Sequence, residues 1–186
     1  MALPRGFKAR AEKIAEDIRA AISAAPDQPL DLHAVAATRK AKIVSAGDLV
    51  ALERLHEIER LQAFAFSACT FDIKGRLFIV YNPIRKPERR ASDITHELAH
   101  LFLDHELSEV QYLDGIPFRT CRADQEEEAT ALAGTILLPR SILLAAARGG
   151  SNHAELARVH GVTEDMARYR WNVTGVERQA RASGSR

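Results

Sequence analysis

Residues 96–100 read His-Glu-Leu-Ala-His, and this H-E-x-x-H spacing is the part of the chain best suited to chemistry. Two histidines four positions apart lie one above the other on a helix, about 6 Å apart along its axis, so both imidazoles can reach one zinc ion. The glutamate between them is then placed to take a proton from an attacking water. The motif therefore predicts a zinc site with His96 and His100 as ligands and Glu97 as general base.

A third protein ligand is needed, because catalytic zinc usually has three and keeps one position open. Asp104 continues the series of every fourth residue, but it lies about 12 Å from His96 along a straight helix, which is too far for a shared ion. The extended metzincin pattern needs Gly and His where this chain has Leu103 and Glu106. The third ligand is therefore expected on another element.

The acidic run 124–128 opens an apolar helix over residues 129–138 and is the best source of that ligand. Helical phase places Glu126 on the face that points toward the core. Glu127 and Glu128 have a simpler explanation, since negative charge stabilises a helix N-terminus. We therefore predict Glu126 as the third ligand.

The elements that position these residues form an α+β pattern. The H-E-x-x-H helix is expected to begin after Ser92 as N-cap and to bury a stripe made of Ile94, Leu98, Leu101 and Phe102. Around it we predict a helix over 8–24, a short helix opened by Asp31, a strand over 42–45, and a hairpin of 63–72 with 76–81. Residues 48–62 are either a helix or an irregular amphipathic segment. The strand over 76–81 is a candidate edge for an extended peptide.

The fold class that follows is a small antiparallel sheet packed against the H-E-x-x-H helix and a second, ligand-bearing helix. An additional N-terminal helix and a C-terminal helical pair complete it. We expect a metallopeptidase domain over 1–150 and a helical extension over 151–186 that packs on it and ends in disorder.

Composition narrows the class of protein. Of 186 residues, 46% are hydrophobic, and 26 Lys and Arg face 25 Asp and Glu, so no global charge indicates nucleic acid or an anionic membrane as partner. The N-terminus has no apolar segment of the secretory type, and no apolar run is long enough for a membrane span. These features predict a cytoplasmic protein. Cys69 and Cys121 are expected to be buried rather than bridged.

The C-terminal stretch 154–173 resembles the first part of a helix-turn-helix, with a turn at Gly161 and Thr163 as N-cap of the second helix. Nearby basic residues suggest DNA contact; they are Arg168, Arg170 and Arg178. Only two helices are indicated and neither has a clear recognition face, so we favour packing or docking of a partner over DNA binding.

Several motifs in order resemble the ImmA/IrrE family of zinc metallo-endopeptidases, which are zincins of the gluzincin type. They are His96–His100, Glu126–Ala133 and Leu137–Pro139, and the likeness extends outward to Leu30–Leu32, Phe78–Pro83 and Arg89–Asp93. In that family the two histidines and the first glutamate of the second motif hold the metal. The resemblance therefore implies one catalytic Zn²⁺ held by His96, His100 and Glu126.

Two further roles follow from the same resemblance. Thr130 stands where the family usually has Asn, one turn past the third ligand, from where a polar group can orient a ligating histidine. Related zincins also use a Tyr or His to stabilise the tetrahedral oxyanion, and Tyr112 and His105 are the candidates here.

The implied activity is zinc-dependent endoproteolysis of a regulatory protein, often a helix-turn-helix repressor, in transcription regulation and stress response. The alternative is a zinc-containing regulator or sensor that acts by binding a partner or DNA without proteolysis. The Glu97→Gln substitution separates the two, because only the enzyme needs a general base.

Overall fold

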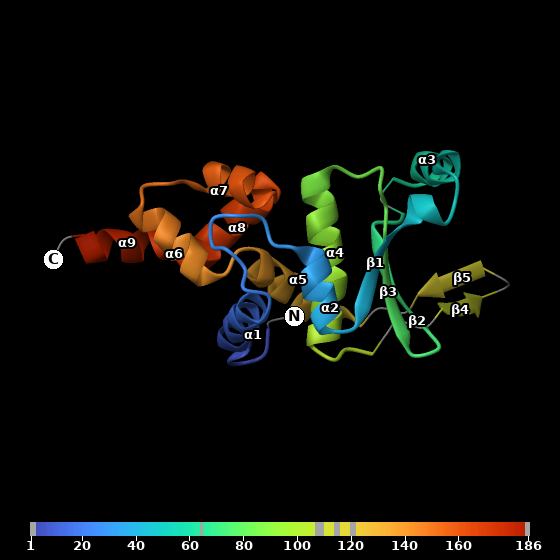
Figure 1. Cartoon of the computed structure of the whole chain (residues 1–186), viewed down its shortest axis with the longest axis horizontal. Helices are drawn as coiled ribbons and strands as arrows, with labels where there is room; N and C mark the ends of the chain where they lie inside the picture. Colours follow the sequence, from blue (N-terminus) through green and yellow to red (C-terminus); the bar gives the residue numbers. More distant parts are fainter. Residues whose placement is uncertain (1–2, 64, 107–109, 114–115, 120–121, 185–186) are drawn as a thin grey trace.

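Helix α4 (Pro87–Phe102) runs through the middle of the molecule, with a small sheet on one side and a cluster of helices on the other (Figure 1). The computed structural model describes residues 3–63, 65–106, 110–113, 116–119 and 122–184, and within 110–119 and at 183–184 it describes the backbone alone. The other helices are α1 (Phe7–Ala21), α2 (Leu32–Thr38), α3 (Leu52–Leu61), α5 (Ala123–Leu137), α6 (Arg140–Arg148), α7 (His153–His160), α8 (Glu164–Thr174) and α9 (Val176–Gly184). The strands are β1 (Ala41–Ser45), β2 (Ala68–Ile73), β3 (Arg76–Tyr81), β4 (Val110–Leu113) and β5 (Ile116–Arg119). The fold is α+β, as predicted.

The predicted hairpin is present as the antiparallel pair β2 and β3. Lys74 and Gly75 both have positive φ, 55° and 77°, which is what a two-residue turn of type I′ requires. The Asp72 carboxylate accepts a hydrogen bond from the Gly75 backbone N–H at 2.7 Å and stabilises the turn. β4 and β5 form a second, separate hairpin.

The main sheet has the order β1-β3-β2, and β1 lies parallel to β3. The sheet is therefore mixed rather than purely antiparallel. The strand over 76–81 is central, so the prediction that it is an edge was wrong. Its residues Leu77–Tyr81 are apolar throughout, which is typical of a strand with neighbours on both sides. Among the described strands of this sheet, β1 and β2 are the edges.

Helix α4 begins earlier than predicted. Pro87 occupies the first helical position, where its missing N–H and its restricted φ are both favourable. Ser92 is therefore not the N-cap; it lies inside the helix, and its hydroxyl donates to the Glu88 carbonyl at 3.3 Å. The first turns are polar, so they show no apolar periodicity that would reveal them in the sequence.

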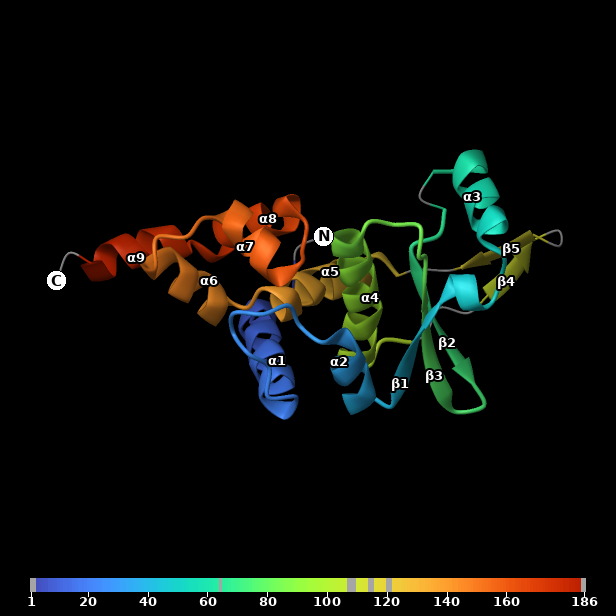
Figure 2. The same cartoon turned by 45° about the horizontal axis from the view of Figure 1, so that its top comes forward.

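The main core lies where α4 and α5 pack together, with α1 covering α5 and the sheet covering α4 (Figure 2). Its largest fully buried side chains include Ile79, Leu98, Leu132 and Ile136. This core holds α4 and α5, the two helices that carry the motif residues, side by side.

The predicted N-cap Asp31 accepts hydrogen bonds from the backbone N–H groups of His33 and Ala34 and starts α2.

A second core joins the end of α5 to helices α6–α8. The predicted turn between α7 and α8 is present, with Gly161 at φ 62° and Thr163 accepting a hydrogen bond from the Met166 backbone at 3.2 Å. A third helix, α9, occupies Val176–Gly184, where the sequence suggested a disordered end. The boundary at residue 150 remains a prediction.

Helix α8 is joined to α1 through a buried ion pair. The Arg170 side chain is 8% exposed; its guanidinium donates to the Glu12 carboxylate at 2.7 Å and to the Leu138 carbonyl at 3.1 Å.

Among the described residues, no single helix is long and apolar enough to cross a membrane, although the bent pair of α5 and α6 passes that test jointly by length and composition.

Candidate metal centre

His96 and His100 lie one turn apart on α4, on the face opposite the buried Leu98. Their Nε2 atoms approach to 3.1 Å, and both side chains are partly exposed. Two nitrogen atoms so close, each with a lone pair available in the neutral imidazole, form the start of a metal site.

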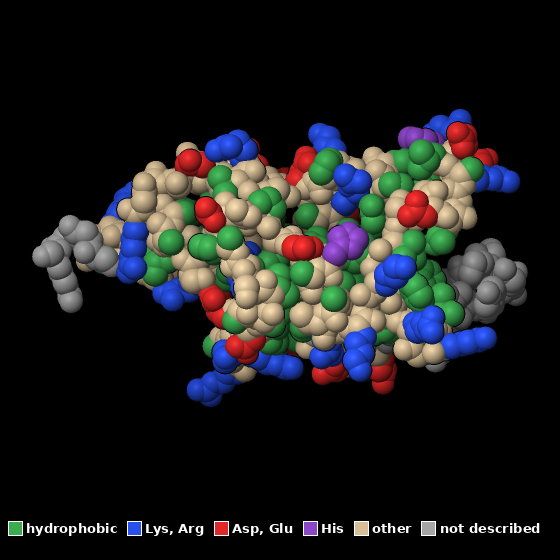
Figure 3. All heavy atoms as spheres, viewed as in Figure 1, with side chains coloured by type: hydrophobic (Ala, Val, Ile, Leu, Met, Phe, Trp, Pro, Cys, Tyr) green, Lys and Arg blue, Asp and Glu red, His purple; other side chains and the backbone are tan. Residues whose placement is uncertain are grey.

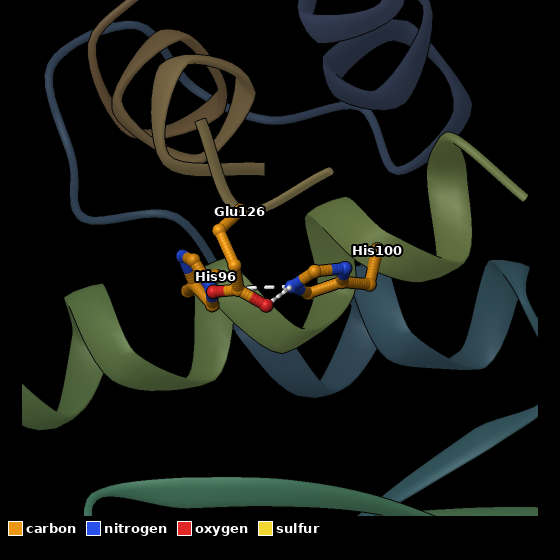
Figure 4. Close-up of side chains that lie close together, drawn as sticks. All are labelled: His96, His100 and Glu126. Atoms are coloured by element: carbon orange, nitrogen blue, oxygen red, sulfur yellow. Dashed lines mark hydrogen bonds and ion pairs between the residues drawn. The ribbon is translucent and has the colours of Figure 1, made fainter. Parts of the chain in front are cut away.

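Glu126 reaches the same point from the first turn of α5 (Figure 4). One carboxylate oxygen lies 3.1 Å from His96 Nε2 and the other lies 3.4 Å from His100 Nε2. Ligand atoms of these three residues all lie within 4.8 Å of one another. The structure therefore brings together the three side chains that the sequence singled out as ligands.

The geometry and the donor set both fit a small divalent ion. In a tetrahedral zinc site with bonds of about 2.0 Å, ligand atoms lie about 3.3 Å apart, close to the separations found here. Two imidazoles with one carboxylate is also a known donor set of catalytic zinc. Burial lowers the pKa of the His100 imidazole, and the nearby His96 lowers it further. Both effects favour the neutral form of His100. Asp104 lies outside this cluster and pairs with Arg39 instead.

Glu97 lies beside the cluster and is held by a residue that sequence reasoning missed. The Thr70 hydroxyl donates a hydrogen bond to Glu97 Oε2 at 2.6 Å, and Thr70 is buried on strand β2. No local signal could have revealed this contact, because it depends on β2 packing against α4.

A cavity of about 320 Å³ opens next to His96 and Glu97. Its wall includes Asp93 from α4 and Met166 from α8, so a C-terminal helix contributes to the surroundings of the site. Burial raises the pKa of the Asp93 carboxyl, whose Oδ2 atom has no hydrogen-bond partner among the described residues.

Comparison with protein families identifies the chain. Residues 56–172, well over half of the sequence, match the peptidase M78 family, described as the IrrE N-terminal-like domain. The chain belongs to this family. No curated protein matches the chain. Membership in this peptidase family implies a hydrolase that acts on proteins or peptides, and the matched residues include every member of the His-His-Glu cluster.

The other predicted site residues of this IrrE-like domain have different outcomes. Thr130 is exposed and lines the cavity beside His96, but among the described contacts it makes no hydrogen bond to either histidine. Its side chain is shorter than the Asn usual in the family. Tyr112 lies in β4, and its side chain is outside the part of the chain that the structure describes.

His105 lies behind His100. Its Nδ1 atom lies 3.0 Å from His100 Nδ1, on the side of that ring turned away from the cluster, and its Nε2 atom lies 3.2 Å from Glu128 Oε2. Both ring nitrogens therefore have partners, and the oxyanion role stays a prediction. Glu128, which the sequence explained only by the charge preference of a helix N-terminus, has this specific partner.

The basic residues that suggested DNA contact are largely committed within the protein. Arg170 is buried against Glu12, and Arg168 pairs with Asp165. On the face seen in Figure 3, Lys and Arg side chains are interspersed with Asp and Glu.

Cys69 is buried, as predicted, and Cys121 lies outside the described residues.

Proposed function

We propose that this chain is a zinc-dependent endopeptidase that cleaves a regulatory protein, such as a helix-turn-helix transcriptional repressor. The convergence of His96, His100 and Glu126 on one point, beside a glutamate held by Thr70, supports the metallopeptidase part. The repressor substrate comes from the family resemblance alone.

In this proposal His96 and His100 would hold the ion through Nε2, and Glu126 would hold it through its carboxylate. When bound, the ion supplies Lewis-acid chemistry, which polarises a scissile carbonyl and makes a nearby water more acidic. Glu97 accepts the proton of the attacking water and then delivers it to the leaving amine. Because Thr70 donates to Oε2 of Glu97, the other carboxylate oxygen remains available for that water. The cavity beside His96 has room for a side chain of the bound peptide.

The test compares wild-type protein with Glu97→Gln, which removes the base and keeps the shape of the side chain. We expect both proteins to purify with about one equivalent of zinc by elemental analysis, since Glu97 is not a ligand in this proposal. Cleavage of a proteome-derived peptide library should fall by at least about 10²-fold in the variant. The control His96→Ala should lose both zinc and cleavage.

The same variant discriminates the alternative function in cells. A strain that carries Glu97→Gln should lose regulatory output, and the inactive protein should retain its substrate during purification. Full regulatory output from Glu97→Gln, together with normal zinc content, would instead establish a regulator that acts by binding without proteolysis.

A further inference from the structure

The end of helix α4 turns back on itself and places His105 over His100. Asp104 adopts a left-handed conformation, φ 53°, directly after the helix. The His105 backbone N–H donates to the His100 carbonyl at 3.0 Å, and the Asp104 backbone N–H donates to the Leu101 carbonyl at 3.4 Å. This pair of hydrogen bonds is a Schellman motif, which brings the residue after the turn against the helix residue five positions earlier.

That contact is usually apolar, but here it joins two imidazoles. The Nδ1 atoms of His100 and His105 lie 3.0 Å apart, and the rings meet edge to face at 65°. His100 directs its other nitrogen, Nε2, at His96 and Glu126. The two nitrogens of His100 therefore have separate partners, one in the metal cluster and one behind it.

Glu128 closes the chain of contacts from the second helix. Its Oε2 atom lies 3.2 Å from His105 Nε2, and the two side chains are only 23% and 6% exposed, respectively. Glu128 stands two residues after Glu126, so one turn of α5 supplies both a cluster member and the group behind it. A carboxylate this sheltered is expected to have a specific partner.

The turn itself is anchored from another element. The Arg39 guanidinium donates to the Leu101 carbonyl and to the Asp104 carboxylate, and it lies over the Phe102 ring at 5.4 Å. These contacts restrain the residues on either side of the turn. His105 is thus positioned by backbone geometry and by Arg39 as well as by its own side-chain contacts.

We infer that Glu128 and His105 are positioning residues that hold the His100 ring with its Nε2 lone pair directed at the metal; this inference rests on the proposed function. If Nε2 of His100 binds the ion, the proton of that neutral ring is on Nδ1. His100 then donates to His105 Nδ1, and His105 donates from Nε2 to the Glu128 carboxylate. Each group in the series Glu128–His105–His100 has one role, so a single arrangement of protons satisfies all of them.

The test measures metal binding directly, with Zn²⁺ alone in competition with a fluorescent chelator. His105→Phe keeps a ring of similar shape and removes the acceptor for His100, so we expect zinc affinity to fall about 10- to 100-fold. His105→Asn restores an acceptor near the position of Nδ1 and should recover most of the affinity. With Co²⁺ in place of zinc, His105→Phe should change the visible absorption of the site, and His105→Asn should resemble wild type.

A second pair of variants keeps the test independent of how His105→Phe folds. Glu128→Leu should also weaken zinc binding, because His105 loses its partner. Asp124→Leu removes an acid from the same turn of α5 without touching His105, and it should leave zinc affinity unchanged.

The outcomes separate the two proposals. If wild type binds one zinc and both His105→Phe and Glu128→Leu bind it equally well, with unchanged cobalt spectra, the positioning role is wrong and the metal site stands. If wild type binds no stoichiometric zinc, the proposed function is wrong, and the positioning role is wrong with it.

Discussion

At the scale of the residue, the charge and phase of a few side chains decide how the site is assembled. Three consecutive glutamates lie near the start of α5; Glu126 contacts both His96 and His100, and Glu128 contacts His105. Residues two apart on a helix differ by about 200° in direction, so they meet different partners. Glu97 is separated from these acids and is held by Thr70 instead. Glu126, Glu128 and Glu97 therefore have different partners around the metal centre.

We predict that Thr70→Val lowers peptide-bond cleavage about tenfold or more with unchanged zinc content. Valine has the shape of threonine but cannot donate, so Glu97 loses a hydrogen bond to a charged group worth about 1.5–3 kcal/mol. The peptide-library assay and elemental analysis measure the two quantities. Thr70→Ser retains a hydroxyl and should keep most of the activity; equal activity of the valine variant and wild type would contradict the role given to Thr70.

At the scale of the element, the close packing of α8 on α5 connects the C-terminal helices to the metal centre. Gly134 lies at the contact, where a Cβ atom would come within 3.1 Å of the Met166 sulfur and 3.2 Å of an Arg170 side-chain carbon. Met166 also lines the cavity beside His96. Helix α8 therefore borders the site from the side, and its resemblance to a helix-turn-helix segment has a packing explanation.

We predict that Gly134→Val lowers the free energy of unfolding by about 1–3 kcal/mol, because the added atoms overpack this contact. Cleavage should fall as well, since Met166 must move in the wall of the cavity. Urea denaturation measures the first effect and the peptide-library assay the second. Gly149→Val is the control, since a Cβ there meets nothing closer than 3.5 Å. No difference between these two variants would refute the packing explanation.

At the scale of the whole molecule, buried basic groups connect the N-terminal helix to the C-terminal half. The Arg19 guanidinium, buried on α1, donates to the Leu137 carbonyl at 3.0 Å, and burial lowers its pKa. His160, on α7, is also buried, and its Nδ1 has no partner in the described part of the chain. Burial, and next the proximity of Arg19, lowers the pKa of His160 below its usual value of 6.5.

We therefore predict that acid destabilises the protein through His160. As the pH is lowered below about 6.5, the unfolded chain binds the proton before the folded protein does. The free energy of unfolding therefore decreases as the pH decreases, until the lower pKa of the folded state is reached. Above pH 6.5 neither state binds the proton and this contribution is constant. The slope from one such group is at most about 1.4 kcal/mol per pH unit.

Urea denaturation at pH 7 and pH 5 measures this effect. His160→Gln should lose part of the decrease in stability that wild type shows between these values. His33→Gln changes an exposed histidine and should keep the decrease of wild type. If the His160→Gln protein shows the same decrease in stability between pH 7 and pH 5 as wild type, the decrease comes from other groups and the prediction is wrong.

Features that depend on a few neighbouring residues could be predicted from the sequence. The spacing of His96 and His100, the phase of Glu126 and the hairpin ending at residue 81 are local, because each depends on backbone geometry within one element or one connection. Which elements meet could not be predicted in this way. The contact of Thr70 with Glu97 joins residues 27 positions apart, and that of His105 with Glu128 joins residues 23 apart.

The central place of β3 has the same origin, since β1 pairs with it from more than 30 positions away. Such contacts leave no periodic pattern in the chain, because they arise from the packing of separate elements rather than from the geometry of one. The groups that could bind the metal were therefore evident in the sequence. The groups that hold those side chains in place became evident only in the folded molecule.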